Sequence, residues 1–314
     1  MPKEITHWLI VDEVLRNPDL TNLAVQYRDN DLRHIAYLGA ILHDAPYYVL
    51  GRRRSRALQL ADRLHGAAGE DTFELLRSAL PILRSKPNNH VFRAFLLGAT
   101  THICSDGIFH PYIYWHSGNV FTAPNHAWQQ HRAFESALDL AFGECFCKRF
   151  SLDTFPLHEY LRRAERILPE LLKAIPLLTD FAEEILSGYR TLARVRCYAT
   201  NTVFRSLTER VNPRLPMSVQ TYTALCYPTP SPLQSRITTP LSYTHPVTGE
   251  AFSASLQEMF NVSVQESVRV WKTFEQCVAE GGDFDECGKS LEVGLCGIAS
   301  SAMCHFAPFV ESKK

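Results

Sequence analysis

The spacing of apolar residues predicts helices along most of the chain. Apolar side chains recur every three or four positions, which is the period of an amphipathic helix. Asn17-Pro18 stops the first helix, and Pro111 is expected to end a long apolar one, because the residue before proline disfavours helical backbone. Residues 112–125 then read as a loop. The predicted helices cover residues 5–15, 32–42, 54–65, 71–83, 89–109, 127–150, 157–174, 178–208, 252–280 and 294–305.

A different pattern occupies residues 211–249. Seven of the 18 prolines lie there, among many Ser and Thr residues, which predicts a long irregular insertion with room for a short hairpin at residues 218–225. Loops of this length are uncommon without a function. The insertion is therefore either a surface excursion or a rim over a functional site. We expect one all-α domain over residues 1–314, with a metal-binding half (1–150) and a helical half (151–314) that carries the insertion.

Composition narrows the possible functions. A hydrophobic content of 46% and a charged content of 21% are ordinary for a globular protein. The net charge of -1 disfavours a nucleic-acid-binding protein without excluding one. No apolar run approaches the roughly 20 residues that a membrane span needs, and the first residues lack the pattern of a signal peptide, so a cytoplasmic location is expected. Nine cysteines without a CxxC pair indicate reduced thiols, most of them in the core.

Histidine carries the strongest chemical signal. Ten of the 13 histidines lie within the first 131 residues. His102-x3-Asp106, then His110, then His131-x3-Glu135 place His and carboxylate side chains one helical turn apart on the same face. The first pair interrupts an apolar helix, where burial without partners would cost several kcal/mol. A divalent cation offsets that cost, and Asp106, with two oxygens, can bridge two metals.

Other candidates are ambiguous alone. His7 lies on an amphipathic helix, where a lone histidine is more often structural. Asp44, at a buried helix end, needs a cation or hydrogen-bond donors, and His65 precedes a glycine pair. A single HxxxD pair also fits a simple His–Asp hydrogen bond, but the second pair on the next helix favours metal. His116 and His126 are rival ligands to His110.

Together these motifs resemble the zinc-dependent phospholipase C family over most of residues 3–140. The resemblance implies a compact all-α bundle with two or three Zn²⁺ ions. It implies one site of Asp44, His65, His102 and Asp106, a second of His110, His131 and Glu135, and a third of His7, Asp106 and the amino terminus. The matching segments are 5–10, 39–48 with Pro46-Tyr47-Tyr48, 63–66, 97–111 and 131–135.

The amino terminus departs from the family pattern. Secreted relatives expose a tryptophan there after signal cleavage, whereas removal of Met1 here would leave Pro2 as the hypothetical ligand. Asp106 and His110 are four residues apart, where the best-known secreted relatives have six. Helical single-strand nucleases of the same superfamily are similar in plan but usually end in HxxxD.

The resemblance implies hydrolysis of a phospholipid-type phosphodiester by metal-activated water, with Asp44 as a ligand that also orients or deprotonates the water. A nuclease or nucleotide phosphodiesterase on the same site is the first alternative. A non-catalytic, zinc-stabilised helical module is the second. Arg52, Arg53 and Arg54 either form a solvated helix start or steer an anionic substrate or lipid surface.

Overall fold

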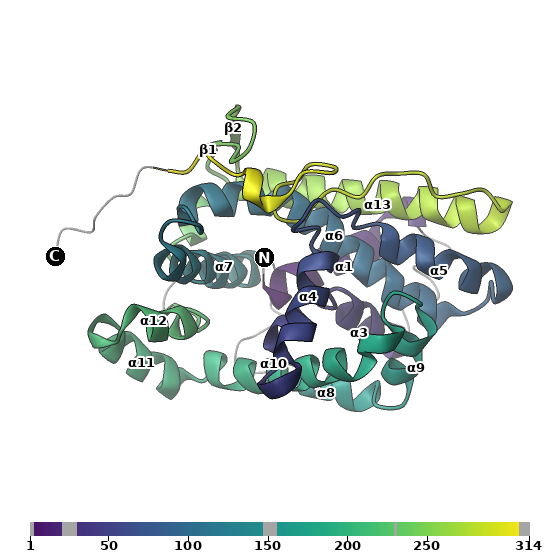
Figure 1. Cartoon of the computed structure of the whole chain (residues 1–314), viewed down its shortest axis with the longest axis horizontal. Coiled ribbons are helices and arrows are strands. Elements are labelled where there is room, and N and C mark those ends of the chain that lie inside the picture. The colour runs from purple at the N-terminus through teal and green to yellow at the C-terminus, as the bar shows by residue number, and fades with distance from the viewer. Residues whose placement is uncertain (1–2, 21–29, 147–155, 229–230, 308–314) are drawn as a thin grey trace.

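The computed structural model describes residues 3–20, 30–146, 156–228 and 231–307, in which helices dominate (Figure 1). The expected all-α class is confirmed. The described part holds a two-stranded antiparallel sheet in which Leu241 pairs with Ala254. The elements are α1 (Glu4–Arg16), α3 (Asn30–Gly39), α4 (Arg54–Leu64), α5 (Glu74–Ser85), α6 (His90–Ser117), α7 (Pro124–Phe146), α8 (Leu157–Arg163), α9 (Ile167–Ala174), α10 (Ala182–Thr200), α11 (Thr202–Val211), α12 (Met217–Thr223), β1 (Leu241–Thr244), β2 (Ala251–Ala254) and α13 (Leu256–Glu280).

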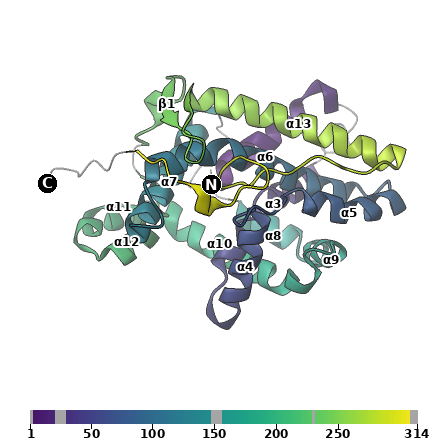
Figure 2. The same ribbon diagram turned by 45° about the horizontal axis from the view of Figure 1, so that its top comes forward.

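Helix α6 runs through the middle of the molecule, between α3, α7 and α13 (Figures 1 and 2). It is apolar around most of its circumference, which is typical of a helix buried on all sides. Two glycines let α3 lie directly on it. A Cβ atom at Gly98 would meet the Ala36 carbonyl oxygen at 1.9 Å, and one at Gly39 would meet the Phe95 carbonyl oxygen at 2.0 Å. The backbones are therefore in contact one turn before His102.

Pro111 does not end this helix, so that expectation is wrong. Helix α6 continues to Ser117, and the expected loop at 112–125 shrinks to the residues between Ser117 and Pro124. Pro111 cannot donate to the Gly107 carbonyl. Gly294 faces that carbonyl, and a Cβ atom there would lie only 2.3 Å from its oxygen. The absence of a side chain at Gly294 thus leaves room beside the Gly107 carbonyl, which Pro111 leaves without its helical hydrogen bond.

Three further expectations need correction. The hairpin placed at residues 218–225 is wrong, because α12 occupies that segment and the hairpin is β1–β2. The closing helix at 294–305 is wrong, because Gly294 and Gly297 adopt positive φ angles and only Ser300–Ala302 forms a 3₁₀ turn. The segments 157–174 and 178–208 each divide into two helices, and Asn201 caps the second of the latter pair.

The core joins α1, α3, α6, α7 and α13 around large buried side chains such as Trp8 and Trp271. Asp139 on α7 fixes the start of α1, because its carboxylate accepts hydrogen bonds from the backbone amides of Ile5 and Thr6. A carboxylate at a helix N-terminus is favourable electrostatically. This contact sets the position of His7, one residue later.

The expectations about the cysteines, membrane-spanning helices and domain division can be compared with the described residues only in part. Among the described cysteines only Cys104 is buried, so the expectation that most thiols lie in the core is wrong; those on the C-terminal segment are exposed because it forms turns. No helix within the described ranges combines the length and the apolarity needed to cross a membrane. The single-domain division stays a prediction.

Candidate metal centre

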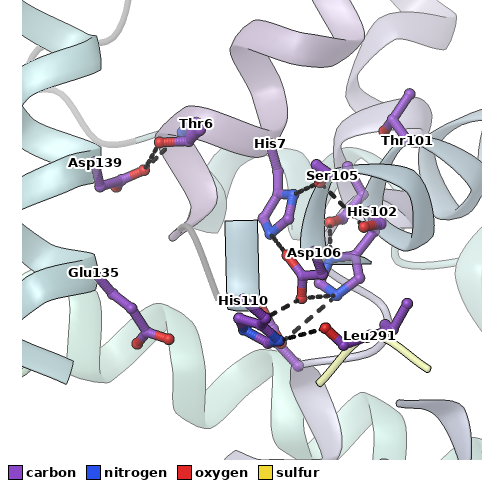
Figure 3. A network of polar contacts seen from close by, with 12 residues as sticks. Thr6, His7, Thr101, His102, Ser105, Asp106, His110, Glu135, Asp139 and Leu291 are labelled. Carbon is purple, nitrogen blue, oxygen red and sulfur yellow. Dashed lines mark hydrogen bonds and ion pairs between the residues drawn. The ribbon is translucent and has the colours of Figure 1, made fainter. Parts of the chain in front are cut away.

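Asp106 lies at the centre of a cluster of buried histidines (Figure 3). Its Oδ2 atom is 3.1 Å from Nε2 of His102 and 3.9 Å from Nε2 of His110, both on α6. Its Oδ1 atom is 3.4 Å from Nε2 of His7 on α1. The expected helical stripe therefore exists, and α1 adds a ligand candidate to it.

The far side of each ring is anchored by a hydrogen bond. In His65, His102 and His110, Nδ1 contacts a backbone carbonyl oxygen and therefore carries a proton, so that in the neutral ring Nε2 is the nitrogen that can bind a metal. The Nδ1 atom of His7 lies 3.0 Å from the Ser105 hydroxyl oxygen. That hydroxyl donates to the His102 carbonyl oxygen, also at 3.0 Å. Such partners orient metal-binding histidines in general. The contacts are His65–Ala61 at 2.8 Å, His102–Ala40 at 2.7 Å and His110–Leu291 at 2.8 Å.

Asp44 joins the cluster from the turn after α3. Its Oδ1 atom is 3.6 Å from Nε2 of His65 and 3.9 Å from Nε2 of His102. Asp44 precedes the 3₁₀ turn Ala45–Tyr48, yet its side chain makes no capping hydrogen bond. Helix α10 holds this turn in place, because a Cβ atom at Gly188 would lie 1.9 Å from the Ala45 carbonyl oxygen.

His131 and Glu135 form a second buried pair on α7. Nε2 of His131 is 2.6 Å from Oε1 of Glu135. The rings of His110 and His131 have centroids 5.6 Å apart, so α6 and α7 present their ligand candidates to each other.

Three groups of potential ligand atoms result, each within 4.8 Å. His110, His131 and Glu135 form one of them, as the resemblance implies. Asp44 and His65 group with His102, while Asp106 groups with His102 and His7 rather than with Asp44. His116 and His126 belong to none of these three groups, and Pro2 lies outside the described residues. The groups are His7–His102–Asp106, Asp44–His65–His102 and His110–His131–Glu135.

The donor set fits bound cations. Six buried atoms here have no hydrogen-bond partner, and burying such atoms without compensation is costly. Imidazole nitrogen and carboxylate oxygen are ligands that zinc accepts. The six atoms are Nε2 of His7, His102 and His110, Oδ1 of Asp44 and both carboxylate oxygens of Asp106.

The protonation states of His7, His110 and Asp106 also suit metal binding. Burial, aided by the neighbouring His102, lowers the pKa of His7 to about 3, and burial lowers the pKa of His110 well below its ordinary value. Both rings are therefore neutral at pH 7, the form that binds metal. Burial opposes the ionisation of Asp106, but the three histidines around it hold its pKa well below the usual range. Burial also disfavours the charged form of His102, yet the carboxylates of Asp106 and Asp44 raise its pKa.

Sequence reasoning assigned no role to three residues beside this cluster. The ring of His43 is buried and stacks on that of His102, with centroids 4.6 Å apart. Leu291 supplies the carbonyl that orients His110. Glu292 is buried and accepts a hydrogen bond from the Tyr114 hydroxyl; burial raises its pKa, and nearby His65 opposes that rise. In the sequence, the feature that could have identified Glu292 is a single acidic residue between the apolar residues Leu291 and Val293.

The three arginines of the steering hypothesis are exposed at the start of α4. Arg53 forms an ion pair with Glu183, with 2.6 Å between Nη1 and Oε2. Arg52 and Arg54 have no ion pair among the described residues. Steering by these side chains stays a prediction.

Comparison with known proteins places this cluster in a family context. No curated protein and no solved structure matches the chain. A family model described as zinc dependent phospholipase C matches residues 6–197. The match covers more than half of the chain and includes all eight candidate ligands from His7 to Glu135. The chain belongs to the zinc-dependent phospholipase C family.

Proposed function

We propose that this chain hydrolyses a phospholipid-type phosphodiester, and that its eight candidate ligands hold two or three Zn²⁺ ions. The observation that carries this proposal is the position of Asp106. Its two carboxylate oxygens lack hydrogen-bond partners and face Nε2 atoms from α1 and α6. A buried carboxylate with that surrounding is suited to bridging two cations.

The eight candidate ligands can be assigned to three metal positions. His7 and Asp106 would hold one position and Asp44 and His65 a second, with His102 completing one of the two, and His110, His131 and Glu135 would hold a third. Zinc held by these residues would supply an activated water at neutral pH and would offset the negative charge of a phosphodiester. Asp44 is suited to orienting the attacking water or accepting its proton, because its Oδ1 atom makes no other hydrogen bond.

Two observations favour a lipid over a nucleic-acid substrate. The chain has a net charge of -1, whereas proteins that bind nucleic acid present a basic surface. The final motif is His131-x3-Glu135 instead of the HxxxD that is usual in the related nucleases. A nuclease on the same site is therefore the second candidate.

The test combines zinc content with turnover. We expect zinc in the wild type and chelator-sensitive hydrolysis of p-nitrophenyl phosphorylcholine. Asp106→Asn should lose zinc and turnover, whereas His116→Gln, an exposed histidine on the same helix outside the three groups, should keep both.

Three outcomes decide between the candidates. Hydrolysis of single-stranded DNA in preference to the phosphorylcholine ester would favour the nuclease. Bound zinc without turnover of either substrate or of bis(p-nitrophenyl) phosphate would favour a stabilising module. Equal zinc content in Asp106→Asn and wild type would refute the proposed ligand set.

A further inference from the structure

Helix α11 exposes a row of apolar side chains and buries two polar ones. Val203, Leu207 and Val211, spaced by four residues, form one exposed stripe, with Val203 78% exposed and Leu207 56%. Arg205 and Thr208 on the opposite side are buried. The Arg205 guanidinium donates to the carbonyl oxygens of Tyr227 and Pro228, which fixes the helix in this orientation. A surface helix normally has the reverse arrangement.

Neighbouring elements carry further exposed apolar side chains. Tyr198 at the end of α10 is 63% exposed, and its ring centroid lies 5.8 Å from that of Phe204 on α11. Helix α12, which lies beside α11 in both views (Figures 1 and 2), exposes Met217, Val219 and Tyr222. We call the exposed apolar side chains of α11 and α12, together with Tyr198, the α11–α12 surface. Contiguous exposed apolar surface usually marks an interaction site.

The charges around this surface are mostly positive. Arg190, Arg194, Arg210 and Arg214 are exposed, against the single exposed acid Glu209 between residues 190 and 228. Arg210 lies three residues after Leu207 on α11 and therefore borders the apolar stripe. None of the four arginines forms an ion pair within the described part of the chain. Their charge thus remains available to an anionic partner.

The surface is connected to the candidate metal centre. Arg132 follows His131 on α7 and donates to the backbone carbonyl of Thr221 on α12. Its guanidinium also lies 5.7 Å from the ring centroid of Tyr222. Helix α12 therefore packs against the helix that carries His131 and Glu135.

We propose that the α11–α12 surface docks on the interface of a bilayer that contains anionic phospholipids. Apolar side chains on one helix face, flanked by arginines and by tyrosines, are the features that bind a membrane interface. A second copy of this chain is a poorer occupant, because a symmetric contact would bring the same arginines together. The inference rests on the proposed function for its choice of a lipid partner, but the docking itself requires no zinc and no turnover.

The primary test is vesicle sedimentation with chelator present, so that hydrolysis does not contribute. Wild type should bind vesicles of phosphatidylcholine with phosphatidylglycerol, and more weakly those of phosphatidylcholine alone. Val203→Ser/Leu207→Ser should weaken binding by about tenfold or more. Arg210→Gln/Arg214→Gln should weaken binding to the anionic vesicles by roughly fivefold per charge. Val262→Ser, at an exposed valine of α13, and Arg166→Gln, at an exposed arginine before α9, are the matched controls and should bind like wild type.

A second measurement separates this inference from the proposed function. Turnover of the water-soluble p-nitrophenyl phosphorylcholine should be equal in wild type and in the surface variants. Vesicle binding that survives Val203→Ser/Leu207→Ser would overturn the docking surface while leaving the hydrolase intact. Vesicle binding that depends on the surface in a protein without turnover would overturn the hydrolase alone. Self-association of wild type that is lost in this variant, with vesicle binding unchanged, would assign the surface to a dimer and refute the proposal.

Discussion

The contact between α3 and α6 makes a sharp prediction for Gly98→Ala. The added methyl group would lie 1.9 Å from the Ala36 carbonyl oxygen and 2.7 Å from the Ala40 amide nitrogen. Both obstacles are backbone atoms of α3 and the turn after it, so no side chain can rotate away. The two segments must instead separate by more than an ångström. The same movement would pull the Ala40 carbonyl away from Nδ1 of His102, now 2.7 Å apart.

The expected cost follows from two opposing effects. Alanine improves the helical propensity of α6 by about 1 kcal/mol. Forcing a methyl group into a packed backbone contact costs about 3 kcal/mol or more. We therefore expect Gly98→Ala to lower the free energy of unfolding by about 2 kcal/mol or more. Zinc affinity should fall as well, because the displaced carbonyl no longer orients the His102 ring.

Gly107→Ala on the same helix is the matched control. A Cβ atom there would have its nearest neighbour at 3.9 Å, the Cα atom of Gly294, which is ordinary contact. This variant should gain about 0.5–1 kcal/mol, because glycine inside a helix is destabilising relative to alanine. Urea unfolding in the presence of chelator measures both variants without a contribution from zinc. A Gly98→Ala protein as stable as Gly107→Ala would refute the packing argument.

Two further predictions concern groups away from the metal centre. Glu4→Gln should lower the free energy of unfolding by about 3–5 kcal/mol, because it leaves the buried Arg196 guanidinium, 2.6 Å from the Glu4 carboxylate, without its counter-charge. In the same urea unfolding assay, the control Glu183→Gln, which breaks the exposed pair with Arg53, should lose less than about 1 kcal/mol. Equal losses in the two variants would contradict this prediction. Burial raises the pKa of the Cys104 thiol from 9.0 to about 12. As pH rises above 9, the thiol loses its proton in the unfolded chain before it does so in the folded protein. The free energy of unfolding of wild type should therefore fall, relative to Cys104→Ala, by up to about 1.4 kcal/mol per pH unit between pH 9 and 12. Parallel curves of unfolding free energy against pH for the two proteins would show that this thiol does not contribute.

The ligand candidates on α6 and α7 could be predicted because their signal is local. His102, Asp106 and His110 are separated by one helical turn, and they interrupt a long apolar stretch. A helix fixes the direction of side chains four residues apart, so the sequence alone places these groups on one stripe. His7, Asp44 and His65 carry no such signal individually, and their place in the cluster was expected only from the family resemblance.

The errors arise where distant segments decide the local structure. Pro111 stays inside α6 because Gly294, far along the chain, approaches the Gly107 carbonyl. The region around residues 291–300 forms turns because its backbone pairs with other segments: the Leu291 amide donates to the His65 carbonyl, and the Ser300 amide donates to the Ala67 carbonyl. Apolar periodicity reports only neighbours within a few turns, so it could not reveal these contacts.

The same C-terminal segment shows that the candidate metal centre depends on more than the residues matched by the family model. That match ends at residue 197 and includes all eight candidate ligands from His7 to Glu135. Yet the orientation of His110 depends on the Leu291 carbonyl, whose amide is in turn hydrogen-bonded to the backbone of His65. One residue beyond the match thus connects ligand candidates from two of the three groups. A metal ligand needs the right orientation as well as the right position. The candidate ligands therefore lie in the first half of the chain, and their orientation depends partly on the second half.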